Sequence, residues 1–137
     1  MAIDLNYRNK GNGDLFDTKA LKYATDIGNG VKNTQIRKFY DYVLDYQNKS
    51  KALSNEAFKM EILPFIKMLN SKVAYASTRN SGGAKLVNDA FVSMMKDCIL
   101  AVSEKEDLNN FKLFFEAVIG FHKGIEEHTK KDNKGNR

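Results

Sequence analysis

The chain contains a single proline among its 137 residues, and its helix-breaking residues gather at only a few places. Proteins built from strands and tight turns use glycine and proline at many short intervals. Here the glycine-rich breaks lie at residues 11–13, 28–30 and 81–83, and the long stretches between them carry apolar residues at helical spacing. This distribution predicts an all-α protein, folded as a compact bundle of five to six helices.

The first two predicted helices lie on either side of the break at residues 28–30. The first covers residues 17–27 and has one apolar face, which the glycines then terminate. The second is predicted to begin near Thr34, a residue type that caps helix N-termini. Its apolar positions follow the helical pattern closely, and they are Ile36, Phe39, Tyr40, Val43 and Tyr46.

Three further helices are predicted after these two. One covers residues 54–79, with a serine as its N-cap. Its apolar stripe keeps its phase across Pro64, which favours a kink or a brief break over a change of element. Another is expected over about 85–103, and the last, capped by Asp107, over about 107–124.

Length and charge limit the organisation and the partners of the chain. We expect a single helical domain over residues 1–137, with the polar ends 1–13 and 126–137 flexible. Lys and Arg number 22 against 17 Asp and Glu, which gives a net charge of +5. Such a surface attracts polyanions moderately, although this excess alone also fits proteins that never contact nucleic acid.

Two features predict a cytoplasmic protein. Cys98 is the only cysteine, so it cannot form an intrachain disulfide, and its apolar neighbours indicate a small buried side chain. The N-terminal residues lack an apolar signal core, and no stretch approaches the roughly 18 apolar residues of a membrane span. We therefore expect neither secretion nor a membrane.

No group of residues has the spacing of a catalytic or metal site. His122 and His128 are too far apart in sequence to share a helical face as metal ligands do. The sequence also lacks a phosphate-binding loop, a nucleophile elbow and a dinucleotide fingerprint. We expect no enzyme activity, no metal and no cofactor.

Three segments place a charged residue among apolar and aromatic residues at helical spacing. They are residues 34–40 (TQIRKFY), 73–79 (VAYASTR) and 111–123 (FKLFFEAVIGFHK), which contain Arg37, Arg79 and Glu116. A packed helix can present a few ionic contacts from a rigid base in this way. The pattern indicates a binding module.

In order and spacing, these segments resemble the signatures of the small subunit of the type III-A CRISPR effector, the Csm interference complex. The resemblance covers roughly residues 34–123, and the last segment is the most specific. It implies a noncatalytic subunit of an RNA-guided ribonucleoprotein in antiviral defence. Such a subunit would contact the backbones of guide RNA and target RNA, other Csm subunits and copies of itself, while base pairing supplies the specificity.

The resemblance makes five cations candidate RNA-binding residues, and these are Arg37, Lys38, Lys67, Lys72 and Arg79. Arg37 and Lys38 fall in the first turn of a helix, where a cation costs about 0.3–1 kcal/mol and a bound phosphate would resolve the conflict. The alternative is that Arg37 merely pairs with Asp41 one turn later. Lys67 and Lys72, together with Lys32 and Lys85, either extend a basic strip or simply face solvent.

Glu116 is a candidate for a structural ion pair. A pair with Lys112 one turn earlier contributes only tenths of a kcal/mol, too little to explain an acid in so apolar a helix. We favour a pair with Arg37 or Arg79 across the bundle, which would make that arginine architectural rather than RNA-facing. Arg79 also has a local explanation, because a cation is favourable in the last turn of a helix.

Two other functions remain open. A free-standing helical nucleic-acid-binding protein would need a recognition helix rich in polar and basic side chains. The second and fifth predicted helices instead have aromatic residues at most positions, which argues against this alternative. A purely structural protein-interaction subunit would make no RNA contact at all. Nucleic acid that copurifies with the protein would argue against this second alternative.

Overall fold

A computed structural model of the chain describes residues 3–81 and 84–135. A π-helical turn (Leu15–Lys19) leads into α1 (Ala20–Ile27), a 3-10 turn (Gly28–Gly30), α2 (Asn33–Ser50), α3 (Asn55–Glu61), α4 (Leu63–Thr78), β1 (Asn80–Ser81), β2 (Ala84–Lys85), α5 (Asp89–Leu100) and α6 (Lys105–Gly135). The all-α bundle predicted from the sequence is confirmed, with one short antiparallel hairpin added. Among the described residues, no helix combines the length and the apolar character needed to cross a membrane.

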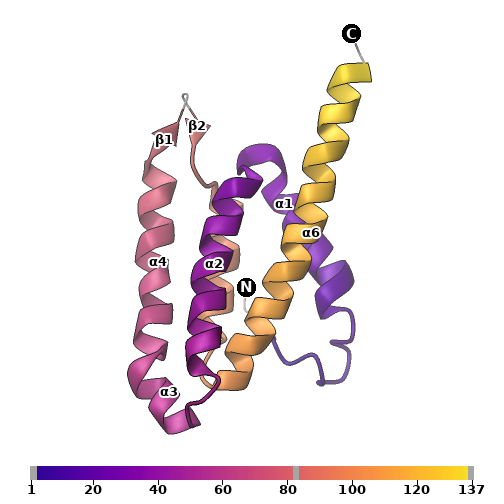
Figure 1. Ribbon diagram of the computed structural model, residues 1–137. Helices are drawn as coiled ribbons and strands as arrows, with labels where there is room; N and C mark the ends of the chain where they lie inside the picture. The colour runs from indigo at the N-terminus through magenta and orange to yellow at the C-terminus, as the bar shows by residue number, and fades with distance from the viewer. Residues whose placement is uncertain (1–2, 82–83, 136–137) are drawn as a thin grey trace.

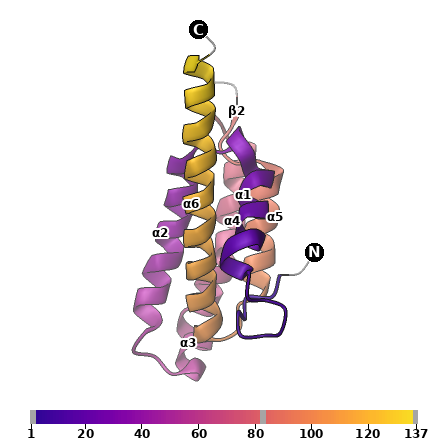
Figure 2. The same ribbon diagram turned by 90° about the vertical axis from the view of Figure 1, so that its right-hand side faces the viewer.

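The helices pack around α6. Helix α6 contacts both α1 and α2, and α4 contacts α5. Figure 1 shows α2 between α4 and α6, and Figure 2 shows α1 and α5 on the other side of α6 from α2. The last turns of α6 project beyond the ends of the other helices (Figure 1). In this arrangement α2 and α4 run side by side, which positions the candidate site.

Helix α2 lacks the side-chain cap that the sequence predicted at Thr34. Its N-cap is Lys32, and its first helical residue is Asn33. The N–H of Asn33 donates to Glu126 Oε2 of α6 over 3.1 Å. A carboxylate at a helix N-terminus satisfies a free N–H and complements the helix dipole. A residue 93 positions away therefore replaces the local cap, and the prediction for Thr34 is wrong.

The predicted helix over residues 54–79 is two helices that separate at Ile62. Its capping serine is confirmed, because Ser54 Oγ accepts a hydrogen bond from the N–H of Ala57 at 3.1 Å. Pro64 lies in the first turn of α4, where its missing N–H needs no intrahelical partner. The predicted brief break is thus confirmed, and Phe65, just after it, is 47% exposed.

The hairpin β1–β2 was not predicted, and it delays the start of α5. Gly82 and Gly83, the expected helix stop, lie outside the described residues. Helix α5 begins only after Asn88, whose Oδ1 accepts from the N–H of Phe91 at 3.0 Å. Asn88 Nδ2 also donates to the carbonyl of Ile27 at 2.9 Å. One side chain therefore caps α5 and joins it to the end of α1.

Both predicted ends of the last helix are wrong. Asp107 is not the N-cap of α6, because its Oδ2 accepts from the N–H groups of Ser103 and Glu104, each at 3.0 Å. This is the contact that the third helical residue makes in a capping box. Gly124 does not end α6, since a glycine inside a helix costs only about 1 kcal/mol.

The segments predicted to be flexible make defined contacts over their described residues. Leu5 is buried, and Asn12 Nδ2 donates to the carbonyls of Asp4 and Asn6. Residues 126–135 continue α6. Flexibility of the two ends stays a prediction, as does the single-domain organisation of residues 1–137.

Aromatic residues of α6 form the centre of the core. Phe111, Phe114 and Phe115 are fully buried, as the wide apolar face of this helix predicts. Cys98 is fully buried on α5, and burial raises the pKa of its thiol well above the ordinary value. The prediction of a small, buried cysteine is confirmed by this position.

Candidate nucleic-acid interface

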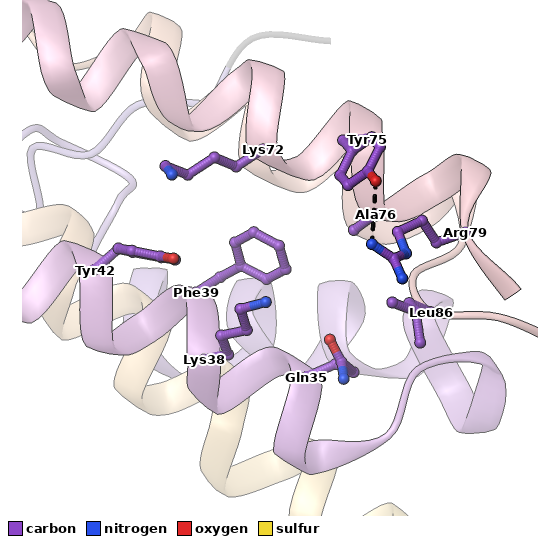
Figure 3. Close-up of a pocket in the computed structure, with 9 residues that line it drawn as sticks. All are labelled: Gln35, Lys38, Phe39, Tyr42, Lys72, Tyr75, Ala76, Arg79 and Leu86. Carbon is purple, nitrogen blue, oxygen red and sulfur yellow. Dashed lines mark hydrogen bonds between the residues drawn. The ribbon is translucent and has the colours of Figure 1, made fainter. Parts of the chain in front are cut away.

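A groove with a volume of about 380 Å³ lies between α2 and α4, and we call it the α2–α4 groove (Figure 3). Its lining residues are Gln35, Lys38, Phe39, Tyr42, Lys72, Tyr75, Ala76, Arg79 and Leu86. They come from α2, from α4 and from the segment that follows β2. Three of the five predicted RNA-binding residues, Lys38, Lys72 and Arg79, therefore lie together.

The lining of the α2–α4 groove is positively charged. No Asp or Glu is among its lining residues. Within the described part of the chain, none of Lys38, Lys72 and Arg79 forms an ion pair with a carboxylate. Uncompensated Lys and Arg side chains in a concave surface attract anions, and phosphate groups accept their charge-assisted hydrogen bonds.

Two tyrosines in the groove contact two of these cations. Lys72 Nζ lies 5.1 Å from the centre of the Tyr42 ring, across the groove. The Arg79 guanidinium lies 5.3 Å from the centre of the Tyr75 ring, and its Nη1 donates to the Tyr75 hydroxyl at 3.0 Å (Figure 3). Cation–π contacts of this kind orient a charged side chain over a ring face. The sequence analysis missed both tyrosines, although Tyr75 stands one helical turn before Arg79.

The backbone of Arg79 leaves the helix and directs the residue toward the groove. Arg79 is the C-cap of α4 and is extended, with φ −91° and ψ 146°. Its carbonyl accepts from the N–H of Leu86 at 3.0 Å, which continues the hairpin. The guanidinium binds Tyr75, which stands one turn earlier in α4. The side chain is thus held beside Tyr75 at the C-terminal end of α4, where a cation is also favourable.

Arg37 lies in a second hollow beside the groove, and the lining of this hollow also includes Lys38, Asp41 and Asp45. Its Nε is 3.6 Å from Asp41 Oδ1, which is the local pair considered as the alternative to a phosphate site. Both side chains are about 60% exposed, so the pair contributes roughly 1 kcal/mol or less. Because Glu126 already accepts from the first N–H of α2, a phosphate at this helix end would compete with a carboxylate of the chain itself.

Of the cations predicted to form a basic strip, Lys67 lies apart from the α2–α4 groove. Lys67 is exposed on α4 and lines neither hollow. A smaller cavity shares Gln35 and Leu86 with the α2–α4 groove and is lined also by Lys32 and Lys85. Positive charge therefore continues from the groove toward the start of α2 and the end of β2.

Glu116 does not form the predicted ion pair with Arg37 or Arg79. Among the described residues, its partners are Lys112 Nζ at 3.2 Å and the hydroxyl of Tyr40 on α2, which donates to Oε1 at 2.5 Å. The expected contact across the bundle exists, but its donor is a tyrosine. The hydrogen bond from Tyr40 lowers the pKa of Glu116, and burial together with this bond raises the pKa of Tyr40 to about 12.

Replacing Tyr40 with phenylalanine should remove this hydrogen bond and keep the buried ring. We expect the free energy of unfolding to fall by about 1 kcal/mol at neutral pH. Because the pKa of Glu116 is lowered in the fold, its contribution is present above the ordinary glutamate pKa and is lost as pH falls through the folded value. Urea denaturation from about pH 7 to about pH 3 measures this, and the difference between the two proteins should shrink on acidification. A difference independent of pH would assign the loss to packing instead.

No metal site accompanies the groove in the part of the chain that the structure describes. Residues 3–81 and 84–135 contain no group of three His, Cys, Asp or Glu side chains able to hold a metal ion. His122 is fully buried, with Nε2 2.7 Å from the carbonyl oxygen of Gly28. This histidine joins α6 to the turn before α2.

Comparison with protein families gives a match over most of the chain. The family model described as Csm2 Type III-A matches residues 10–128. The match contains all three segments singled out in the sequence and every residue that lines the α2–α4 groove. No curated protein and no solved structure matches the chain.

Proposed function

Because this chain belongs to the Csm2 family and is the small subunit of the type III-A CRISPR (Csm) complex, we propose that it binds guide and target RNA without cutting them. The observation that carries the proposal is the α2–α4 groove, where three cations lie together without a carboxylate. Cations of this kind bind phosphate and sugar groups, position the RNA and carry no sequence information. Base pairing between the two RNAs then supplies the specificity.

The five candidate residues contribute unequally in this proposal. Lys38, Lys72 and Arg79 are the principal RNA-binding residues because they line one groove. Arg37 contributes less, since Asp41 compensates part of its charge. Lys67 contributes where RNA continues along α4 toward its N-terminus.

The proposal includes contacts with other Csm subunits and with copies of this chain. Three apolar side chains are exposed near the junction of α3 and α4, namely Met60 (74%), Phe65 (47%) and Met68 (51%). Groups of exposed apolar residues favour protein contacts. A noncatalytic subunit of this kind would hold RNA in the groove, join its neighbours through the apolar residues and work in the cytoplasm without a cofactor.

The test is the binding of the isolated protein to labelled single-stranded RNA, measured by fluorescence anisotropy over a series of salt concentrations. With three phosphates neutralised at about 0.7 per contact, log affinity should fall against log salt with a slope of about −2. Two unrelated RNA sequences should bind equally. Lys22→Glu, an exposed change on α1 away from the groove, should leave the slope unchanged.

A different outcome would favour the alternative function. The exposed apolar side chains of α3 and α4 also fit a purely structural subunit that joins proteins and makes no RNA contact. Absence of RNA binding, with the helical circular dichroism spectrum intact, would support that alternative. Tight binding to one sequence that does not respond to salt would contradict both descriptions.

A further inference from the structure

The α2–α4 groove contains exposed aromatic rings, which binding to phosphate does not require. Tyr75 is 62% exposed, and Tyr42 faces the groove from the opposite helix (Figure 3). Each tyrosine has a cation beside its ring. Proteins stack unpaired bases on aromatic side chains placed along a positively charged groove. The aromatic residues therefore suggest a ligand with a flat ring as well as a phosphate.

A second observation, independent of the tyrosines, points to the same ligand. Gln35 Oε1 is buried and, among the described residues, accepts no hydrogen bond. Figure 3 shows Gln35 across the groove from Arg79 and Leu86. Gln35 also lines the groove, so a ligand that donates an N–H or O–H there would satisfy Oε1 once the side chain turns toward it. A phosphodiester has no proton to donate, whereas the base and the ribose of a nucleotide both do.

Building on the proposed function, we propose that the α2–α4 groove binds one unpaired nucleotide of the RNA. Its base stacks on Tyr75, its base edge or ribose hydroxyl donates to Gln35, and its phosphates contact Lys38, Lys72 and Arg79. The volume of about 380 Å³ lies at the small end of the range for small-molecule sites, about 300–1,000 Å³, which suits one nucleotide rather than a base pair. Because every base has a stacking face, this site tolerates any sequence.

The experiment compares two labelled RNA duplexes that differ only by one bulged nucleotide. Stacking of one base on an aromatic side chain changes affinity by about tenfold, so the full chain should bind the bulged duplex about tenfold more tightly. Tyr75→Ala should reduce this ratio to about one, whereas Tyr75→Phe keeps the ring and should keep the ratio. Asn70→Ala, an exposed change on the same helix but outside the groove, is the matched control and should also keep it.

Each remaining outcome overturns the nucleotide site. Equal affinity of the unmodified protein for both duplexes would remove it and leave binding to the RNA backbone intact. A preference for the bulge that survives in Tyr75→Ala, with folding checked by circular dichroism, would also remove it. Failure to bind either duplex or single-stranded RNA would remove the nucleotide site together with the RNA-binding function.

Discussion

Replacing Phe115 with alanine is expected to lower the free energy of unfolding by about 3–5 kcal/mol. Phe115 is fully buried on α6, and its ring centre lies 5.6 Å from that of Tyr40, 6.4 Å from Phe91 and 5.8 Å from Phe111. The truncation removes apolar burial and leaves a cavity between α2, α5 and α6. Single domains are stable by only about 5–15 kcal/mol, so this change should remove a large part of the stability.

Urea denaturation followed by far-UV circular dichroism measures this loss. Leu100→Ala provides the control, because Leu100 is 71% exposed at the end of α5 and its truncation should change the stability by no more than about 0.5 kcal/mol. A loss below about 1 kcal/mol for Phe115→Ala would contradict the central position of α6. Truncation of a phenylalanine enclosed by three rings lowers the free energy of unfolding by more than this.

The helices could be predicted from the sequence because burial on one side of a helix repeats with the helical period. In α2, four predicted apolar positions, Ile36, Phe39, Tyr40 and Val43, are buried. The helix ends could not be predicted in the same way, because distant residues decide them. Glu126 accepts from the start of α2 where a local cap by Thr34 was expected.

The candidate site could be predicted only in part. The resemblance to a family identified Lys38, Lys72 and Arg79, and the structure adds that they share one groove. Tyr42 and Tyr75 were missed because a tyrosine at helical spacing looks the same in sequence whether it packs in a core or lines a groove. The position of a side chain on an exposed or a buried face depends on how far apart α2 and α4 lie, which no local pattern encodes.

The partners of charged residues could also be predicted only in part from the sequence. The sequence predicted an ion pair for Glu116 across the bundle, and Glu116, although exposed, does contact α2 there. Arginines were predicted as partners because they carry the charge opposite to that of Glu116. The donor to Glu116 is instead the hydroxyl of Tyr40. Arg79 is consequently not held by Glu116, and its guanidinium lies in the groove beside Tyr75.

The double substitution Lys72→Glu with Arg79→Glu is expected to weaken binding to single-stranded RNA by about a hundredfold or more. Each hydrogen bond from a charged group contributes about 1.5–3 kcal/mol, which is more than tenfold in affinity for each cation lost. The new carboxylates add repulsion from the phosphates. With Lys38 as the remaining groove cation, the slope of log affinity against log salt should change from about −2 to about −0.7.

Both substituted side chains are exposed, so the double variant should remain folded, and circular dichroism checks this. The matched control is Lys22→Glu with Lys96→Glu, which makes the same change in net charge at exposed positions of α1 and α5 outside the groove. Loss of net charge alone weakens the general attraction of RNA in both double variants. The salt slope separates the loss of groove contacts from the loss of net charge, because the slope reflects the number of phosphates in direct contact. Only the loss of groove contacts should reduce the slope by about two-thirds. An equal reduction of slope in the control would mean that RNA contacts are spread over the whole surface, and the α2–α4 groove would no longer be the binding site.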